Sequence, residues 1–287
     1  DRDRIVHSRA LHNRKTLELR VGQLDPADSG LFIRQRSLEE RASLYMYLGG
    51  VPKYLEQINP KISIEQNMNR LCFSRDGFFV TEYETLFKEQ FRSIRHYEAI
   101  VEQLAQGAAS MSDLSRKSGI AKGGGLNEYL QNLVRAQFVR EEVPALPLGA
   151  RRLRTKRYRL ADSFLLFYFR YMHRNRALIE KNKNRENLFR AITTSSLPIY
   201  RGFAFERLCE ESMPRILAHC GLNLVDVEAM GPFFQQRTTV TPGVQVDQVV
   251  LRRDRVAMLM EFKYLQKPAG LEVADSVRAK LGKIPLP

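Results

Sequence analysis

The spacing of hydrophobic and polar residues divides the chain into segments with different expected structures. Residues 1–36 contain one predicted strand, residues 16–21, followed by a turn-rich stretch. In residues 37–85 the spacing is helical, and Ser37 is placed to cap a helix that stops at Gly49. We therefore expect a short β-segment followed by a helical domain in this part of the chain.

Residues 86–162 show three helical patterns followed by a strand, a basic loop and a second strand, which resembles a winged helix-turn-helix. We expect helices at residues 96–106 and 110–119, a third helix after a glycine triplet, and a wing between residues 139 and 158. In a DNA complex the outward face of the third helix would meet the major groove, although Glu128 on that face repels phosphate. The outward residues expected to contact DNA are Asn127, Gln131 and Arg135.

The predicted wing carries a cluster of cations with no acid among them. These cations are Arg151, Arg152, Arg154, Lys156 and Arg157. Neutralising several phosphates here would give salt-sensitive affinity that does not depend on base sequence. Two alternatives stay open, because such a run can be only a solvated loop and winged helices also bind proteins.

Residues 163–199 predict a helical connector. Its first half has apolar residues at helical spacing, which indicates a buried stripe and not a base-stacking surface. These residues are Phe164, Phe167, Tyr168, Tyr171 and Met172. The polar part that follows is strongly basic and leads to the last domain.

Residues 200–287 predict a compact unit of one helix, three strands and a second helix. The helices are expected at residues 202–219 and 271–283, with a strand at residues 222–227 and a hairpin at residues 244–264. The first helix places Glu206 near its first turn.

Charged residues inside the predicted hairpin are unexpected, because both of its strands are otherwise apolar on both faces. Side chains alternate along a strand, so Glu261 and Lys263 share a face. A loop centred on Asp254 would set Asp247 directly opposite Glu261. Two carboxylates on directly opposite positions of a hairpin repel each other unless a cation or a proton lies between them. A site whose ligands are all oxygen atoms suits magnesium.

Composition narrows the class of protein. The chain has 287 residues, 44% of them hydrophobic, which favours a multidomain protein, mainly α plus α/β. The 46 Lys and Arg residues against 32 Asp and Glu give a net charge of +14, which favours polyanions: nucleic acid first, an anionic membrane surface second. No apolar run approaches the length of a membrane span, and three unpaired cysteines fit reduced thiols, so we expect a soluble cytoplasmic protein. The first residue is Asp1, so we expect the chain to be part of a longer protein.

The order of elements, with Asp247, thirteen intervening residues and then Glu261-Phe262-Lys263, resembles the PD-(D/E)XK nuclease superfamily. The resemblance implies that Asp247 and Glu261 bind Mg²⁺ and that Lys263 orients the attacking water. Glu206 matches the extra acid that some members place near the metal. Two departures are Val246, where the family's name has proline, and the end of the chain before the fourth strand of the family core.

A wider resemblance covers most of residues 14–280 and is to bacterial and archaeal AAA-type P-loop ATPases with a nuclease-like tail. It rests on the segment Leu48 to Leu55, the winged helix and the hairpin, taken in order. The resemblance places Gly49, Gly50 and Pro52 in the lid of the ATPase, near the adenine, and residues 11–24 in the last strand of its core. The plain alternative is that these glycines only end a helix. No phosphate-binding loop is present, so ATP would bind only through an upstream domain.

Three functions follow from these patterns. The first is a Mg²⁺-dependent nuclease acting on DNA under control of an ATPase domain. The second is an ATP-controlled switch that binds DNA or a protein without cutting it. The third is a purely protein-directed scaffold. A homo-oligomer is compatible with each, because AAA-type ATPases often assemble into rings or dimers.

Overall fold

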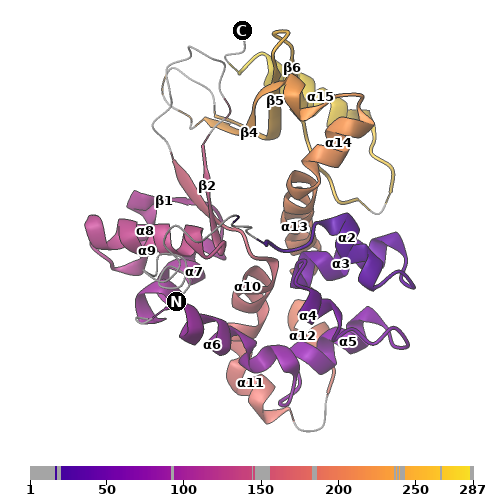
Figure 1. The fold of residues 1–287 in the computed structure, drawn as a ribbon, viewed down its shortest axis with the longest axis vertical. Coiled ribbons are helices and arrows are strands. Elements are labelled where there is room, and N and C mark those ends of the chain that lie inside the picture. The colour runs from indigo at the N-terminus through magenta and orange to yellow at the C-terminus, as the bar shows by residue number, and fades with distance from the viewer. Residues whose placement is uncertain are drawn as a thin grey trace.

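The computed structural model describes residues 21–91, 94–143, 156–182, 186–235, 243–265 and 267–284, together with residues 17, 145, 237 and 239. Within these ranges the protein is a mixed α/β structure with two three-stranded antiparallel sheets, ordered β1-β3-β2 and β4-β5-β6. No helix of the described ranges combines the length and apolar character needed to cross a bilayer. Figure 1 shows the second sheet at one end of a larger helical body, with helix α13 rising from that body towards it.

The first helices form the side of the body that carries the Gly-Gly stop. They are α2 (Pro26–Phe32), α3 (Leu38–Leu48), α4 (Pro52–Leu55), α5 (Ile64–Cys72) and α6 (Phe78–Gln90). The predicted cap is confirmed, because the Ser37 hydroxyl accepts from the Glu40 N–H while the Glu40 carboxylate accepts from the Ser37 N–H. Helix α3 ends at Gly49, whose φ is +73°. The strand predicted at residues 16–21 lies almost wholly outside the described residues.

The next segment has the predicted order of three helices and two strands. It comprises α7 (Ile94–Leu104), β1 (Ala109–Ser110), α8 (Met111–Ser118), α9 (Gly124–Arg135), β2 (Val139–Glu142) and β3 (Arg157–Leu160). Ser110 caps α8 by accepting from the Asp113 N–H, and Gly119 ends the helix with φ of +72°. The short strand β1 was not predicted, and it pairs with β3 to complete the sheet.

The aromatic stripe is buried, as predicted, but its helix is not regular. It consists of α10 (Ser163–Phe167), a π-helical turn (Tyr168–Met172), a 3₁₀ turn (His173–Asn175) and α11 (Arg176–Lys181), and α12 (Leu188–Thr193) follows. Phe167 packs against Tyr47 and Tyr200, with ring centroids 5.2 and 5.8 Å away. The Tyr200 hydroxyl donates to the Met46 carbonyl at 2.7 Å. These contacts fix the first half of α13 against α3 and α10.

The last unit contains α13 (Leu197–Glu211), α14 (Met213–His219), β4 (Val227–Gln235), β5 (Val244–Arg252), β6 (Ala257–Met260) and α15 (Leu271–Leu281). The predicted strand at residues 222–227 is wrong, because Leu224–Asp226 form a 3₁₀ turn and the strand begins at Val227. Pro232 lies inside β4, where a break in register between Gly231 and Phe233 accommodates a residue that lacks an N–H. The predicted helix 202–219 is two helices, because Pro214 lies at the start of α14. Helix α13 already begins at Leu197, so Glu206 lies beyond its second turn and not near its first.

The prediction that both hairpin strands are covered on each face holds for most of β5, whereas every residue of β6 is only half-buried. Val246 belongs to a cluster with Phe233 on one side, and Val250 packs with Met213 and Leu217 of α14. The backbone N–H of Ala145, beyond β2, donates to the Pro232 carbonyl at 3.0 Å. The two sheets are therefore connected through the end of β2 as well as through α13.

Candidate active site

The hairpin of β5 and β6 brings the predicted acidic pair together. The strands are antiparallel, and Gln248 lies opposite Met260. Extending this register by one residue sets Asp247 opposite Glu261, as expected for a loop centred on Asp254. The Phe262 N–H donates to Asp247 Oδ2 at 2.9 Å, so the pairing continues beyond the end of β6 through a side chain.

Lys263 joins the two carboxylates. Its Nζ lies 3.0 Å from Glu261 Oε2 and 3.6 Å from Asp247 Oδ2. The acidic side chains are only 8% and 5% exposed, whereas that of Lys263 is 43% exposed. Although burial disfavours the ammonium ion, its bond to Glu261 and the charge of Asp247 hold the pKa of Lys263 above its usual value. All three residues therefore meet on one face of the hairpin.

Helix α13 contributes Glu206 to the same region. Burial first, and then the negative charge of Asp247, raise the pKa of the Glu206 carboxyl to about 7, while Lys263 opposes the shift. Glu206 is placed here because Tyr200 and Ala204, on another face of the helix, are buried in the main core. A carboxyl group with such a pKa can take up or release a proton near neutral pH.

Lys280 joins Asp247, Glu261 and Lys263 in one ion-paired charge cluster, and the sequence pattern did not indicate it. It projects from α15, and its Nζ lies 2.5 Å from Glu261 Oε1. Each oxygen of Glu261 therefore has its own lysine. A lysine on an amphipathic helix is unremarkable in sequence, and only the packing of α15 against the hairpin reveals the pair.

The donor set fits a magnesium ion only in part. Mg²⁺ commonly takes one or two carboxylates and completes its shell with water and substrate oxygens, and Asp247 with Glu261 supplies such a pair. Among the described residues, no three or more His, Cys, Asp or Glu side chains are grouped so as to hold a metal. A cation at this position would therefore compete with Lys280 for Glu261.

A cavity of about 320 Å³ opens beside the charge cluster. Glu206 and Asp247 line one part of it, and Arg157 and Arg159 of β3 line another. Arg159 is an internal bridge, since it pairs with Glu142 of β2 at 2.5 Å and with Glu210 of α13. The cavity is thus bounded by both sheets and by α13.

The residues predicted to contact DNA have different environments. Asn127 and Arg135 are both exposed on α9. The Gln131 amide donates to Glu141 at 2.8 Å, and Lys156 pairs with the same carboxylate at 2.6 Å. The Arg157 guanidinium lies 4.0 Å from the centre of the Phe234 ring.

Arg151, Arg152 and Arg154 lie outside the described residues. Contact of the whole set with DNA stays a prediction. Glu141 already neutralises one of its cations, Lys156.

The glycines predicted to approach a nucleotide approach the chain itself. A Cβ on Gly50 would lie 1.9 Å from the Leu24 carbonyl oxygen, so no larger residue fits. The Gly50 N–H donates to Gln23 Oε1 at 3.2 Å. Pro52 lines a cavity of about 240 Å³ together with Gln23. Gly49 thus ends a helix, and the backbone of Gly50 packs closely against Leu24. Binding of a nucleotide by these residues stays a prediction.

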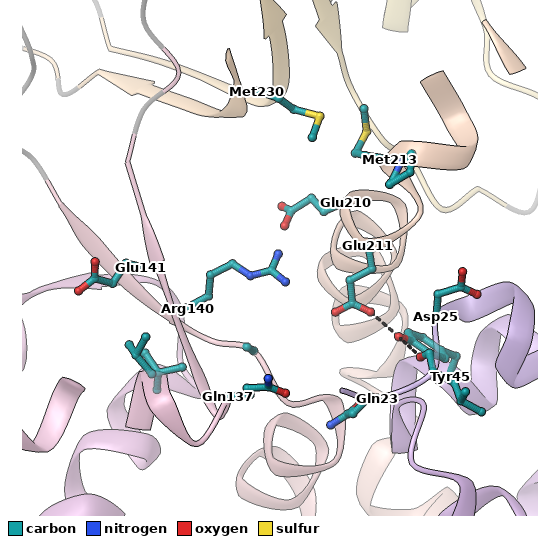
Figure 2. Close-up of a pocket in the computed structure, with 15 residues that line it drawn as sticks. Gln23, Asp25, Tyr45, Gln137, Arg140, Glu141, Glu210, Glu211, Met213 and Met230 are labelled. Atoms are coloured by element: carbon teal, nitrogen blue, oxygen red, sulfur yellow. Dashed lines mark hydrogen bonds between the residues drawn. The ribbon is translucent and has the colours of Figure 1, made fainter. Parts of the chain in front are cut away.

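A wider cavity of about 640 Å³ lies between the first helices, β2 and α13. Figure 2 shows Arg140 and Glu211 pointing into it from opposite sides, with Tyr45 hydrogen-bonded to Glu211. Burial, and then the charge of Glu211, raise the pKa of the Tyr45 hydroxyl. None of the predicted catalytic residues lines this cavity, although Glu210 borders both cavities.

Comparison with known proteins gives family-level similarity. Residues 168–275 match the model of DUF234, described as archaea bacterial proteins of unknown function. An uncharacterized protein of Methanocaldococcus jannaschii is 27% identical over 201 residues, which cover 70% of this chain and 44% of that protein. The chain thus spans less than half the length of this relative. No solved structure matches the chain significantly.

The segment that matches the family model contains all four predicted catalytic residues. Glu206, Asp247, Glu261 and Lys263 lie within residues 168–275. Lys280 and the whole of the first sheet lie outside that segment.

Proposed function

We propose that this chain is the DNA-acting portion of a larger ATP-dependent protein. In this proposal residues 86–162 form a winged helix that contacts DNA, and residues 200–287 form a PD-(D/E)XK-type domain that hydrolyses phosphodiesters with Mg²⁺. The observation that carries the proposal is the meeting of Asp247, Glu261 and Lys263 on one face of the hairpin. Residues 37–85, which include Gly49 and Gly50, would be the helical lid of the ATPase, whose nucleotide site requires an upstream domain.

Each of the four predicted catalytic residues has a chemical role in this proposal. Asp247 and Glu261 would hold the cation, which when bound polarises the phosphate and lowers the pKa of a bound water. Lys263 is placed to orient that water and to balance the charge that develops on the phosphate. Glu206, with a pKa of about 7, can exchange a proton at its carboxyl group near neutral pH.

The test is Asp247→Asn with DNA and Mg²⁺. Removal of one carboxylate charge from a two-carboxylate site should lower the rate of DNA hydrolysis about a hundredfold or more. The matched control is Asp275→Asn, which makes the same change at an exposed surface pair with Arg278. Hydrolysis by Asp247→Asn at the rate of Asp275→Asn would show that the site assignment is wrong.

A second function is favoured by Lys280. Asp247 and Glu261 are already balanced by Lys263 and Lys280, so the cluster is neutral in total without a bound cation. In this alternative the domain holds DNA or a protein without cutting, and α15 fills the place of the metal. The ammonium ion of Lys280 would then be a permanent part of the fold.

Lys280→Met separates the two functions. If the site is built for a cation, removing the competing ammonium should tighten Mg²⁺ binding about fivefold, since such a pair is worth roughly 1 kcal/mol. Isothermal titration calorimetry with MgCl₂, in the absence of DNA, measures this affinity. The control is Lys267→Met, at an exposed lysine that precedes α15. Absence of Mg²⁺ binding in the parent and in Lys280→Met would leave the non-cleaving function.

A further inference from the structure

The cavity beside Glu206 and Asp247 contains two cations that the proposed catalysis does not use. Arg157 and Arg170 both line it. Within the part of the chain that the structure describes, neither has an acidic side chain at ion-pair distance. Arg170 contacts a neutral group, the Gln106 amide oxygen, at 3.5 Å, and Arg157 lies over the ring of Phe234. By contrast, Arg159 in the same wall is neutralised by Glu142 and Glu210. The two remaining guanidinium groups favour an anionic ligand.

Aromatic rings line the same cavity. Phe203 is 60% exposed although it lies on α13, one turn before Glu206. Phe234 of β4 also lines the cavity, and the Arg157 guanidinium lies over its ring. An exposed phenylalanine beside unpaired arginines matches the chemistry of a stacking platform for a base attached to a phosphate.

The size of the cavity restricts what can enter. Its volume is about 320 Å³, at the lower end of the range for small-ligand sites, which is about 300–1,000 Å³. That volume suits a single small ligand, whereas a duplex presents paired and stacked bases together with two backbones. One nucleotide fits such a space only when it is not paired and stacked in a double helix.

We propose that this cavity takes one unpaired nucleotide of single-stranded DNA, an inference that rests on the proposed function and specifies its substrate. The base lies against Phe203, and the adjoining phosphates lie towards Arg157 and Arg170. The strand that leaves the cavity then passes Glu206 and Asp247, where its phosphodiester meets the charge cluster. A paired strand would need its end opened first, because the cavity volume suits one nucleotide.

The experiment measures binding without cleavage. Fluorescence anisotropy with a labelled dT12 oligonucleotide in EDTA gives the affinity for single strands, and a labelled 12-base-pair duplex at the same salt gives the affinity for double strands. We expect dT12 to bind at least tenfold more tightly than the duplex. Phe203→Ala should weaken dT12 binding about tenfold, because stacking on one aromatic ring contributes about that much. Arg170→Glu should weaken dT12 binding by at least as much, because it replaces a phosphate-binding cation with an anion.

Matched variants make the result specific. Phe32→Ala removes another exposed phenylalanine, on α2, and Arg190→Glu reverses an exposed arginine on α12. Both should stay within twofold of the parent. Phe203→Trp keeps an aromatic face and should retain dT12 binding, which separates stacking from a folding defect. Equal affinity for dT12 and duplex, or equal effects of Phe203→Ala and Phe32→Ala, would overturn the proposal. Binding of free thymidine monophosphate as tight as that of dT12 would overturn it too, because the site would then serve a free nucleotide.

Failure of this inference can be told apart from failure of the proposed hydrolysis. Cleavage that depends on Asp247, combined with equal binding of dT12 and duplex, would reject the unpaired-nucleotide site alone. Binding of dT12 that depends on Phe203, combined with no cleavage under Mg²⁺, would reject hydrolysis alone.

Discussion

At the scale of single residues, the charge cluster is organised by opposite charges at short range. Asp247 and Glu261 are almost fully buried, and each contacts Lys263. Glu206 stands apart, because burial and the charge of Asp247 make its ionised form unfavourable. Lys263 and Lys280 balance the charges of the hairpin carboxylates, but they do not offset the free-energy cost of ionising Glu206 on α13.

Glu206 should therefore make stability depend on pH. Its pKa is about 7 in the folded protein against a usual value of 4.5, so the folded state holds this proton more tightly than the unfolded chain does. The favourable contribution is complete below pH 4.5 and is lost as the pH rises through about 7. Glu206→Gln should accordingly raise the free energy of unfolding by about 1 kcal/mol more at pH 8 than at pH 5, a value reduced because the carboxyl group is partly exposed.

Urea unfolding followed by circular dichroism at the two pH values measures this difference. The control is Glu272→Gln, at an exposed carboxylate of α15, for which we expect equal effects at both pH values. A Glu206→Gln gain that is the same at pH 5 and pH 8 would contradict the burial-based pKa shift.

At the scale of elements, Arg159 connects the first sheet to α13. Its guanidinium group pairs with Glu142 on the neighbouring strand and with Glu210 on the helix. The three side chains are 17%, 10% and 14% exposed, so solvent screens them little. Burial raises the pKa of Glu210, against the opposing effect of Arg159. Glu210, one partner in this bridge, lines both cavities.

Arg159→Met should destabilise the protein by about 3 kcal/mol at pH 7, because it leaves two buried carboxylates without a counter-charge. Chemical unfolding at pH 7 gives this value. Arg278→Met is the matched control, since Arg278 pairs with Asp275 on the surface and such pairs contribute about 1 kcal/mol or less. If the two variants lose the same stability, the Arg159 ion pairs do not stabilise the protein as a buried bridge to α13.

At the scale of the whole molecule, the candidate site is assembled from segments far apart in sequence. The turn after α7, strand β3, helix α13 and strands β4 and β5 all line one cavity. Not every cation behind the net charge of +14 is available to an anionic ligand. Among the described residues, Lys156 and Arg159 form ion pairs with glutamates, whereas Arg157 and Arg170 form none. The surface available to a polyanion is therefore decided by ion pairing as well as by composition.

Local features of the structure could be predicted from the sequence because their causes are local. Ser37 and Ser110 cap helices through residues three positions away, and Gly119 ends a helix through its own backbone conformation. The opposition of Asp247 and Glu261 depends only on the length of the loop around Asp254 and on the two-residue repeat of a strand. The burial of the aromatic stripe depends on helical spacing in the same way.

Only the tertiary structure decided the remaining features, because they depend on which distant segments pack together. Gly231-Pro232 lies within a strand because the neighbouring strand β5 supplies the pairing and a bulge absorbs the proline. Lys280 contacts Glu261 because α15 packs on the hairpin, and Arg159 contacts Glu210 because α13 lies against the first sheet. Residue spacing along the chain specifies the face on which a side chain lies, whereas its partner depends on the element that covers that face.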